Sequence, residues 1–532
     1  MVIPDWTESK LISLSVALGA REIEGWTTVE ERLCGNVPAI DPTIVCSIKD
    51  QIVAGEDPLG EAFCKLRSPA ERRPLGATYT PRRIVEAMMS WAEAIDQPAR
   101  VVDPGVGSAR FLHQAGRAFE RAQLIGSELD PVAAIIARGN LAAAGYVNRA
   151  RVILGDYRDL RLEPVSGRTL YIGNVPYVRH HLISRARKEW LSARAAELGL
   201  KASQLAGLHV HFFLSTVLSA QPGDFGAFIT AAEWLDVNYG RFVRELFLGP
   251  LGGQSILIIE PAAMPFPDAN TTAAITSFQV GSEPRSIRVK RIKTVRDLAG
   301  ANVGLALSRE TLKKASRWSS LTHRRKHVPD GYVELGELCR VHRGQVTGAN
   351  KIWIAGEHSK ELPPSVLFPT VTKARELIAA GLVLRDTSKL RRVIDLPVEL
   401  NEIGPAQRRA IDRFLRWARK VGASDSFIAK NRKAWWAVGL RQPAPILATY
   451  MARRPPAFVR NVAGARHINI AHGLYPREQF DESILNELVR FLSSSASTSD
   501  GRTYAGGLTK FEPREMERIL VPEPRLLVSW AA

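Results

Sequence analysis

The sequence has 532 residues, 45% hydrophobic and 24% charged, a balance typical of a globular protein too long for a single core. Its apolar runs are much shorter than the ~20 residues of a bilayer span, and its first residues lack the basic start and apolar core of a signal peptide. We therefore expect a cytoplasmic protein with no membrane partner. The formal net charge of +18 favours a polyanionic partner such as nucleic acid.

The four cysteines lie far apart and fit no metal-ligand spacing, so no metal site is predicted. In so large a chain, buried free thiols are expected rather than a disulfide framework. The cysteines are Cys34, Cys46, Cys64 and Cys339.

In chain order, residues 1–75 are predicted to form an N-terminal extension of helices and loops without a catalytic signature. Thr80 and Pro81 then resemble an N-cap followed by proline at the first helical position. Beyond this helix, short aliphatic or β-branched runs end in Gly, Asp or Asn, and helical stretches separate most of them. This alternation predicts an α/β fold with a parallel, doubly wound sheet, extending to about residue 270. The runs lie within 100–112, 122–131, 150–157 and 168–177.

The first of these runs ends in a glycine-containing turn, "DPGVGSARF". Gly105 and Gly107 permit a tight turn and a close approach of the backbone to a ligand at the start of a helix. A dinucleotide motif would need a third glycine where Arg110 stands. Asp103 would also repel a pyrophosphate, so a ligand that carries an ammonium group suits the turn better.

Acidic side chains also follow the second and third strands, as Glu128 and Asp156. Ligands of doubly wound sheets bind beyond the carboxyl ends of the strands, where an acid of the second strand commonly holds ribose hydroxyls. Asp156 is placed to accept a hydrogen bond from an exocyclic amine, although it could be a simple turn residue. With Asp103, these acids predict a pocket for a cationic nucleoside, and S-adenosylmethionine is such a molecule.

The fourth strand ends in "GNVPY", residues 173–177. The Asn174 side-chain oxygen and a backbone carbonyl can together accept both hydrogens of an exocyclic amine, which orients its nitrogen lone pair toward an electrophile. Tyr177 could stack on a base turned out of a nucleic acid. An ordinary asparagine turn is the alternative, but a position beside the first strand favours the functional interpretation.

This series of motifs resembles the gamma class (TaqI-like) of type II DNA adenine-N6 methyltransferases. The order is the same: a Tyr-Thr-Pro segment, "DPGVGSARFL", "SELDP", "GDY" and an equivalent of Asn-Pro-Pro-Tyr. The resemblance is strong over about 76–270 and looser over 330–525. It implies a class I S-adenosylmethionine-dependent methyltransferase domain at 76–280, followed by a C-terminal DNA target-recognition domain at 331–532.

The resemblance also implies roles for individual residues. The methionine part of the cofactor would contact the turn after the first strand. Its ribose would bind Glu128, and its adenine would bind Asp156. The target base would meet the turn after the fourth strand, with a further aromatic, Tyr239, against the flipped base. The cofactor residues are Thr80, Asp103, Pro104, Gly105, Gly107, Glu128 and Asp156, and the catalytic residues are Asn174, Val175, Pro176 and Tyr177.

One position departs from the family pattern, because Val175 stands where the family has the first proline. The family uses the main-chain carbonyl there, which valine also has. Pro176 still biases Val175 toward extended geometry, but valine has a freer φ than proline. We expect activity to be retained, and an inactive copy is the alternative.

Basic residues concentrate toward the C-terminal half. Residues 281–330 contain 13 Lys and Arg but 4 Asp and Glu, and we predict that they form a basic connecting segment. The following region mixes basic and aromatic residues, a combination that suits phosphate contact and base stacking. Its tryptophans could equally belong to a core. The predicted DNA-binding residues are Arg343, Lys351, Lys430, Arg432, Trp435 and Trp436.

The sequence therefore predicts a site-specific enzyme that methylates the N6 amine of a flipped adenine in double-stranded DNA, as the modification enzyme of a restriction-modification system. Alternatives are methylation of RNA or of protein glutamine, and a catalytically inactive DNA-specificity subunit with a methylase-like body. An asparagine at the first position of the turn favours adenine over the N4-cytosine relatives, which usually carry serine. Residues 1–75 are too few for a nuclease domain, so we expect cleavage to belong to a separately encoded restriction endonuclease.

Overall fold

The structure is a computed structural model, and its chain divides into two compact units. The N-terminal unit comprises Met1–Arg324 with Ala505–Gly507, and the C-terminal unit comprises Arg325–Tyr504 with Leu508–Ala532. The residues that the structure describes are 6–35, 38–68, 71, 79–260, 263, 272–298, 304–315, 317–322, 328–401, 403–504 and 508–531.

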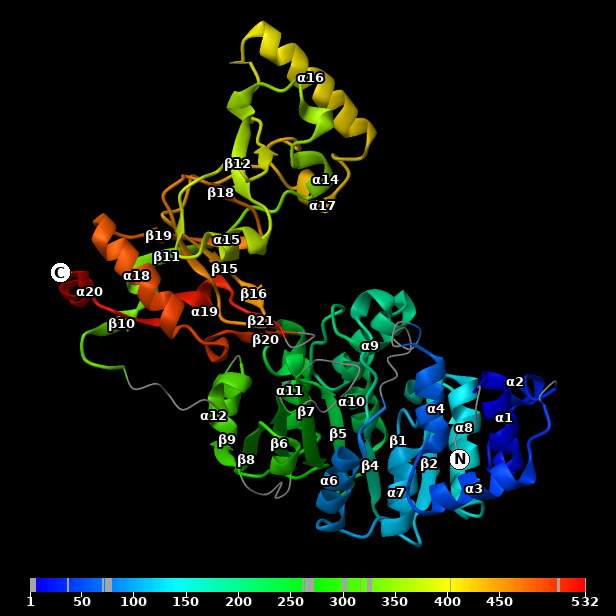
Figure 1. Cartoon of the computed structure of the whole chain (residues 1–532). Helices are drawn as coiled ribbons and strands as arrows, with labels where there is room; N and C mark the ends of the chain where they lie inside the picture. Colours follow the sequence, from blue (N-terminus) through cyan, green and yellow to red (C-terminus); the bar gives the residue numbers. More distant parts are fainter. Residues whose placement is uncertain are drawn as a thin grey trace. The chain divides into compact units, whose positions relative to one another are not determined.

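The N-terminal unit is built on a sheet with the strand order β3-β2-β1-β4-β5-β7-β6-β8-β9 (Figure 1). Strands β1 to β5 are mutually parallel, and β7 lies antiparallel between β5 and β6. The order reverses between β1 and β4, which is where doubly wound sheets open a crevice at the carboxyl ends of their strands. The strands are β1 Arg100–Asp103, β2 Gln123–Glu128, β3 Ala150–Leu154, β4 Thr169–Asn174, β5 Phe225–Ala231, β6 Gly253–Ile259, β7 Ala273–Gln279, β8 Ser286–Ile292 and β9 Leu305–Ser308.

Both faces of this sheet are covered by helices, so its central strands are apolar on both sides. Val101 and Ile172 belong to a core that includes residues of α6, α7 and α8, whereas their neighbours Val102 and Tyr171 belong to a second core with α9, α10 and α11. This alternation follows from the two-residue period of a strand. The helices are α6 Arg82–Glu93, α7 Arg110–Ala118, α8 Pro131–Ala143, α9 Arg185–Glu197, α10 Leu208–Ser219 and α11 Arg241–Leu248.

The N-terminal extension folds as helices that gather around α8 (Figure 1). Leu11, Leu14 and Phe63 pack against the outer face of α8. Arg138 of α8 and Glu30 form an ion pair whose side chains are both 0% exposed, with 2.7 Å between Nε and Oε1. Removal of either partner would leave an unpaired buried charge. The extension is therefore held on α8 by an ion pair as well as by apolar packing. Its helices are α1 Glu8–Ala17, α2 Thr28–Leu33, α3 Pro42–Val53 and α4 Pro58–Leu66.

Part of the range 281–330, which we predicted to connect two domains, instead continues the sheet. β8 pairs in parallel with β6, and β9 pairs antiparallel with β8. Ile287 and Val289 of β8 pack into the second core, which explains why this segment joins the sheet. The many basic residues of the segment hid this strand pattern in the sequence. Residues 299–303, 316 and 323–327 of the range lie outside the described residues.

The C-terminal unit contains a five-stranded sheet in the order β11-β19-β15-β17-β13 and three smaller sheets. Helix α18 (Glu482–Ser495) packs Leu488 and Leu492 into a core with the large sheet. Helix α16 (Pro405–Lys420) buries Ile411 and Phe414 in a separate core. The strands of the large sheet are β11 Cys339–Arg343, β13 Val383–Leu384, β15 Ile446–Thr449, β17 Phe458–Asn461 and β19 Ala471–Pro476.

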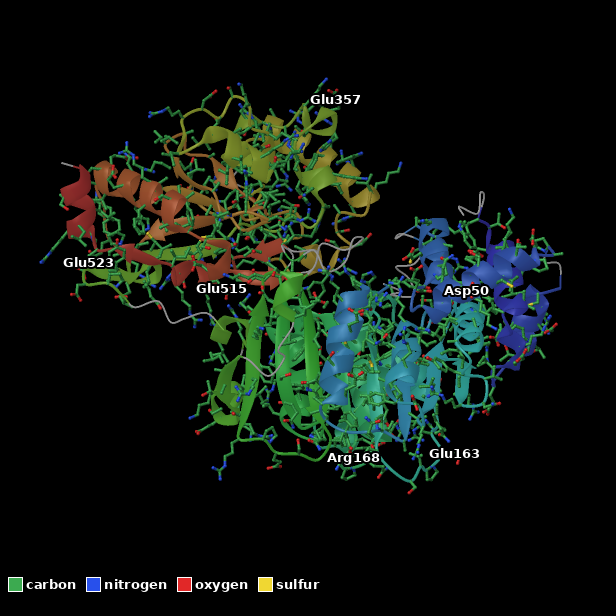
Figure 2. The ribbon with its side chains drawn as sticks, turned by 60° about the horizontal axis from the view of Figure 1, so that its bottom comes forward. Asp50, Glu163, Arg168, Glu357, Glu515 and Glu523 are labelled. Carbon is green, nitrogen blue, oxygen red and sulfur yellow. The ribbon has the colours of Figure 1, made fainter. Side chains whose placement is uncertain are left out.

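Among the described residues, no helix is long and apolar enough to cross a bilayer. All four cysteines are free thiols, as predicted; Cys34 and Cys339 are buried, but Cys46 is exposed and Cys64 is half-buried. Charged side chains such as Asp50, Glu163 and Glu357 stand on the outside of their units (Figure 2).

Candidate functional site

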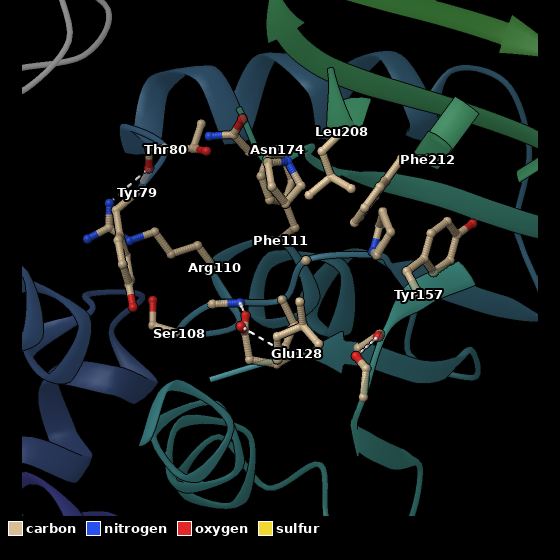
Figure 3. A pocket seen from close by; sticks show the side chains of 18 residues that line it. Tyr79, Thr80, Ser108, Arg110, Phe111, Glu128, Tyr157, Asn174, Leu208 and Phe212 are labelled. Atoms are coloured by element: carbon tan, nitrogen blue, oxygen red, sulfur yellow. Dashed lines mark hydrogen bonds between the residues drawn. The ribbon is translucent and has the colours of Figure 1, made fainter. Parts of the chain in front are cut away.

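A pocket opens at the carboxyl ends of β1 and β4, at the reversal of strand order. Glu128 and Asn174 lie on opposite sides of it in Figure 3, and Leu208 and Phe212 of α10 contribute apolar side chains. Polar strand ends and an apolar wall are the composition expected of a site for a small organic ligand. The predicted residues that line the pocket are Thr80, Pro104, Gly105, Gly107, Glu128, Asn174 and Pro176.

Asp103 ends β1 and is only 1% exposed. Its Oδ1 accepts the Gly105 N–H at 3.3 Å, and its Oδ2 has no hydrogen-bond partner within the described part of the chain. Burial raises the pKa of Asp103 to about 8, the nearby Glu128 charge adds to this rise, and the Gly105 hydrogen bond opposes it. A buried carboxyl of this kind would be stabilised in its ionised form by a cationic ligand.

The turn after β1, residues 104–110, is called the donor loop below. Its backbone is unusual: Gly107 has φ +54° and Ala109 has φ +71°, and Ala109 is the one non-glycine residue with positive φ among the described residues. A Cβ on Gly105 would lie 3.5 Å from Pro176 and 3.7 Å from the Asn174 carbonyl oxygen, so the loop passes close to the end of β4. The structure thus brings the turns after the first and fourth strands together.

Glu128 ends β2 and closes the opposite side of the pocket. Its carboxylate accepts the backbone N–H groups of Gly107, Leu129 and Asp130 at 2.9, 2.9 and 3.0 Å. Burial raises the pKa of Glu128, and these hydrogen bonds act against that effect. The carboxylate is therefore fixed in direction while it faces the pocket.

The turn after β4 carries the predicted catalytic residues, but only some of them line the pocket. Asn174 and Pro176 line the pocket, but Val175 is fully buried and its N–H donates to the Ile229 carbonyl of β5 at 3.1 Å. The Tyr177 hydroxyl is buried without a hydrogen-bond partner among the described residues, and burial raises its pKa well above the usual range. A Cβ on Gly173 would lie 2.4 Å from Asp103 Oδ1, which shows how closely the two strand ends approach.

Asp156 is not part of the pocket lining, in contrast to the prediction. Its carboxylate is occupied by Arg158, with Nε to Oδ1 at 2.9 Å and Nη2 to Oδ2 at 2.5 Å. Burial alone would raise the pKa of Asp156, but the hydrogen bonds from Arg158 outweigh it and lower the pKa. Its sequence neighbours Gly155 and Tyr157 line the pocket instead.

Tyr239 also lies outside the pocket lining. Its hydroxyl donates to Glu233 at 2.5 Å, and its ring lies 6.0 Å from the ring of His209. His209 is next to Leu208 on α10, and burial lowers its pKa to about 4. Tyr239 therefore neighbours the wall of the pocket through α10 rather than entering it.

The predicted DNA-binding residues of the C-terminal unit fall into two groups. Arg343, Lys351 and Lys430 are exposed. The other residues are engaged within the unit: Arg432 donates to the Val346 carbonyl at 2.7 Å, and Trp435 and Trp436 pack against the α16 core. Both tryptophans are half-buried: their rings pack against the α16 core, and the ring of Trp435 lies 6.3 Å from that of Trp353. Their contact with DNA stays a prediction.

The structure reveals another set of exposed cations, which we call the α16 stripe: Arg409, Arg413, Arg416 and Lys420. Their spacing of four, three and four residues places them on one face of the helix, opposite the buried Ile411, Phe414 and Ala418. Arg413 pairs with Glu361 at 2.6 Å. This spacing was visible in the sequence, but we did not identify it.

Among the described residues, no group of three or more His, Cys, Asp or Glu is arranged to hold a metal ion. The order β3-β2-β1-β4-β5-β7-β6 with antiparallel β7, and a pocket at the β1–β4 reversal, define a class I S-adenosylmethionine-dependent methyltransferase fold, as predicted.

Comparisons with known proteins agree with this class. Residues 321–530 match the family described as "Type II methyltransferase M.Eco57I, C-terminal domain". The chain is 50% identical over 526 residues to Type II methyltransferase M.XamI of Xanthomonas campestris pv. amaranthicola, covering 97% of this chain and 98% of the relative. The chain therefore belongs to the type II methyltransferases, the DNA-methylating enzymes of restriction-modification systems.

Two more distant matches cover very different shares of the chain. A segment of 107 residues is 29% identical to the tRNA1(Val) (adenine(37)-N6)-methyltransferase of Porphyromonas gingivalis, covering 20% of this chain and 42% of that protein. The solved structure of the type IIL restriction-modification enzyme MmeI in complex with DNA is 12% identical, with a TM-score of 0.54, and the match covers 94% of this chain and 78% of that one. At this identity the second match shows the fold alone.

Proposed function

We propose that this chain transfers a methyl group from S-adenosylmethionine to the N6 amine of an adenine that is flipped out of double-stranded DNA at a specific site. The observation that carries the proposal is the juxtaposition of two strand ends. The donor loop after β1 passes within 3.7 Å of the Asn174 carbonyl, measured from the Cβ position of Gly105. A methyl donor held by one turn would therefore face an amine held by the other.

The residues around the donor loop fit S-adenosylmethionine. The buried, unpartnered Asp103 Oδ2 offers a negative charge to a cationic methionine portion, and Glu128 offers its remaining lone pairs to ribose hydroxyls. When bound, this cofactor supplies a methyl group on a sulfonium, which is a strong electrophile. The apolar wall of Leu208 and Phe212 excludes water from the transfer. Asp156 pairs with Arg158 and lies outside the pocket lining, so this proposal does not depend on it.

The turn after β4 would hold the target amine. The Asn174 side-chain oxygen and the Val175 carbonyl accept the two N–H groups, which draws the nitrogen lone pair out of conjugation with the ring. With the amine held by these two acceptors, transfer of the methyl group from the bound cofactor would be direct, without a covalent enzyme intermediate, and the methylated amine would release one proton to solvent. Tyr177 stacks on the flipped base, and Tyr239 supports the α10 wall from outside.

Adenine is the favoured base for two reasons. The turn begins with asparagine rather than the serine usual in N4-cytosine enzymes. The relative from Porphyromonas gingivalis that aligns with 107 residues of the chain is named for adenine-N6 methylation.

The C-terminal unit, which includes all of the predicted domain 331–532 except residues 505–507, would recognise the DNA sequence. The α16 stripe presents four exposed cations over ~16 Å of helix, and the exposed Arg343, Lys351 and Lys430 add to its charge. Cations on a solvated face contact phosphates without sequence preference, so they would hold the duplex while other residues of the unit read bases. A separately encoded endonuclease would cleave unmodified DNA.

Modification mapping tests this proposal. DNA from cells that express the chain would be sequenced by a long-read method, with Asn174→Ala as the control, and its nucleosides would be separated and weighed by mass spectrometry. We expect N6-methyladenine in one sequence motif from the wild type and none from the variant. N4-methylcytosine in its place would overturn the choice of base, and unmodified DNA from folded, cofactor-supplied enzyme would overturn the proposal.

A further inference from the structure

A carboxylate of the N-terminal extension reaches the back of the donor loop. Asp57 is the N-cap of α4, where its Oδ1 accepts the Gly60 N–H at 2.9 Å. Its Oδ2 accepts Ser108 Oγ at 2.5 Å and Arg110 Nε at 2.6 Å. Ser108 and Arg110 both belong to the donor loop and line the pocket. One side chain of the extension therefore joins a helix cap to the wall of the pocket.

The carboxylate is also joined to α8. Asn140 donates its Nδ2 to Asp57 Oδ1 at 3.0 Å and to the Ser108 carbonyl at 2.8 Å. A Cβ on Gly60 would lie 2.1 Å from Asp57 Oδ2 and 2.6 Å from Ser108 Oγ, so α4 approaches the loop as closely as glycine permits. With a side chain that is 13% exposed, Asp57 makes charge-assisted hydrogen bonds in a largely dry setting.

These contacts converge on the part of the loop with unusual backbone conformation. Ala109, with φ +71°, lies between Ser108 and Arg110, the two donors to Asp57. A left-handed conformation is unfavourable for a non-glycine residue and persists only where its surroundings impose it. Asp57 is the group that fixes the residues on either side of Ala109.

A second contact from α4 reaches the pocket by another route. The ring of Phe63 in α4 lies 6.1 Å from the ring of Tyr79, measured between centroids, and the Arg110 guanidinium lies over the same Tyr79 ring with Cζ 5.4 Å from its centroid. Tyr79 lines the pocket and lies 3.9 Å from the Cβ position of Gly107. Arg110 also donates to the Thr80 carbonyl at 2.9 Å (Figure 3).

We propose that Asp57 is a positioning residue for the methyl-donor site, and that the N-terminal extension forms the back wall of that site. Asp57 acts through Ser108 and Arg110, which hold the donor loop in the conformation that presents the Gly105–Gly107 backbone to the cofactor. This inference rests on the proposed function for the identity of the ligand. It assigns the extension a part in cofactor binding, not in DNA recognition.

The test compares two N-cap aspartates of the extension. Asp57→Asn keeps a side chain that can cap α4 but removes the charge that holds the loop. Asp41→Asn changes the N-cap of α3, where Asp41 is exposed and accepts the Thr43 N–H at 2.8 Å; within the described part of the chain, Asp41 forms no hydrogen bond to the donor loop. Both purified full-length variants would be titrated with S-adenosylmethionine by calorimetry without DNA, and their thermal unfolding would be followed.

We expect Asp57→Asn to weaken cofactor binding about tenfold, as the loss of a charge-assisted hydrogen bond would. The KM for S-adenosylmethionine should rise by the same factor while kcat and the Kd for DNA stay as in the wild type, and excess cofactor should restore the rate. Hydrogen exchange of the amides in residues 105–112 should accelerate. Asp41→Asn should match the wild type in all of these measurements.

If Asp57→Asn binds the cofactor as the wild type does while its melting temperature falls, Asp57 is a structural residue and the inference is wrong. If Asp57→Asn does not fold, Ser108→Ala removes one of the same hydrogen bonds with less disturbance. Unchanged cofactor affinity and unchanged amide exchange in Ser108→Ala would then overturn the inference. Failure of the wild type to bind S-adenosylmethionine is a separate result that overturns the proposed function instead.

Discussion

Asp103 in the N-terminal unit is 1% exposed, whereas the cations of the α16 stripe in the C-terminal unit stand in solvent. A buried carboxyl changes its protonation with its surroundings, and burial raises the pKa of Asp103 to about 8. Exposed arginines stay charged and respond to dissolved salt instead. Binding of a cationic ligand near Asp103 should therefore depend on pH, whereas binding of an anionic partner to the α16 stripe should depend on ionic strength.

The largest effect is expected at the turn after β4. Asn174→Ala should lower kcat by about 10²–10³, as the loss of one positioned hydrogen-bonding group at a reacting centre does. Binding of S-adenosylmethionine should persist, because the donor loop is untouched. Single-turnover transfer of a labelled methyl group would measure the rate. The exposed Asn148 provides the control, and Asn148→Ala should leave the rate unchanged; equal losses in both variants would contradict the assignment.

Cofactor affinity should depend on the protonation of Asp103. A cation binds the ionised form, so below the free-protein pKa of about 8 the Kd should rise about tenfold for each unit that the pH falls. Asp103→Asn should bind about 100-fold more weakly at pH 8 and lose this dependence. Calorimetric titration between pH 6 and pH 9 would measure both. A wild-type Kd that is flat across this range would contradict the role of Asp103.

The stability of the free protein should change with pH in the opposite direction. Because the folded-state pKa of Asp103 lies near 8 and its ordinary value is 3.8, its contribution to stability is fully present below pH 4 and is lost as the pH rises through 8. Asp103→Asn should lack this loss and melt above the wild type at pH 9, without cofactor. Thermal unfolding at pH 6 and pH 9 compares the two proteins. A stability difference between the two proteins that is the same at pH 6 and at pH 9 would contradict the raised pKa of Asp103.

The α16 stripe should respond to salt. Arg409→Gln with Arg416→Gln should reduce the slope of log affinity against log salt by about 2, since each lost phosphate contact removes about 0.9. DNA binding would be measured by fluorescence anisotropy at several salt concentrations. The exposed Arg121 precedes β2, at the amino ends of the parallel strands and away from the pocket, and Arg121→Gln should leave the slope unchanged. An unaltered slope in the double variant would place the duplex elsewhere.

The smallest effect concerns the position that departs from the family pattern. The N–H of Val175 donates to the Ile229 carbonyl at 3.1 Å, and proline has no N–H to donate. Val175→Pro should therefore lower the free energy of unfolding by about 1 kcal/mol while changing the methylation rate little. Chemical denaturation and steady-state kinetics would measure the two quantities. A large gain in rate would mean that the rigidity of proline matters more than this hydrogen bond.

The sequence was sufficient to predict the sheet and most of the pocket because those features depend on local backbone requirements. Glycines, prolines and acids at strand ends are tied to turns, and turns are placed by the order of strands. Gly105, Glu128 and Asn174 line the pocket for this reason. Asp156 lies outside the lining and its carboxylate pairs with Arg158, only two residues away, so its contact with the cofactor stays a prediction.

Side chains that pack or pair over long separations could not be predicted in the same way. Asp57 and Ser108 are 51 residues apart, and no motif links them. From the sequence, Trp435 and Trp436 could lie on a surface or in a core. Only the structure shows that they pack against the α16 core. The basic strand β8 was mistaken for a connecting segment because its charges concealed the alternation of Ile287 and Val289.

The C-terminal unit is one continuous stretch of chain apart from residues 505–507, and it begins at Arg325. A single genetic crossover near that residue would therefore replace nearly the whole unit while leaving the β1 and β4 strand ends intact. Relatives could in this way exchange the DNA sequences they mark without rebuilding the catalytic chemistry.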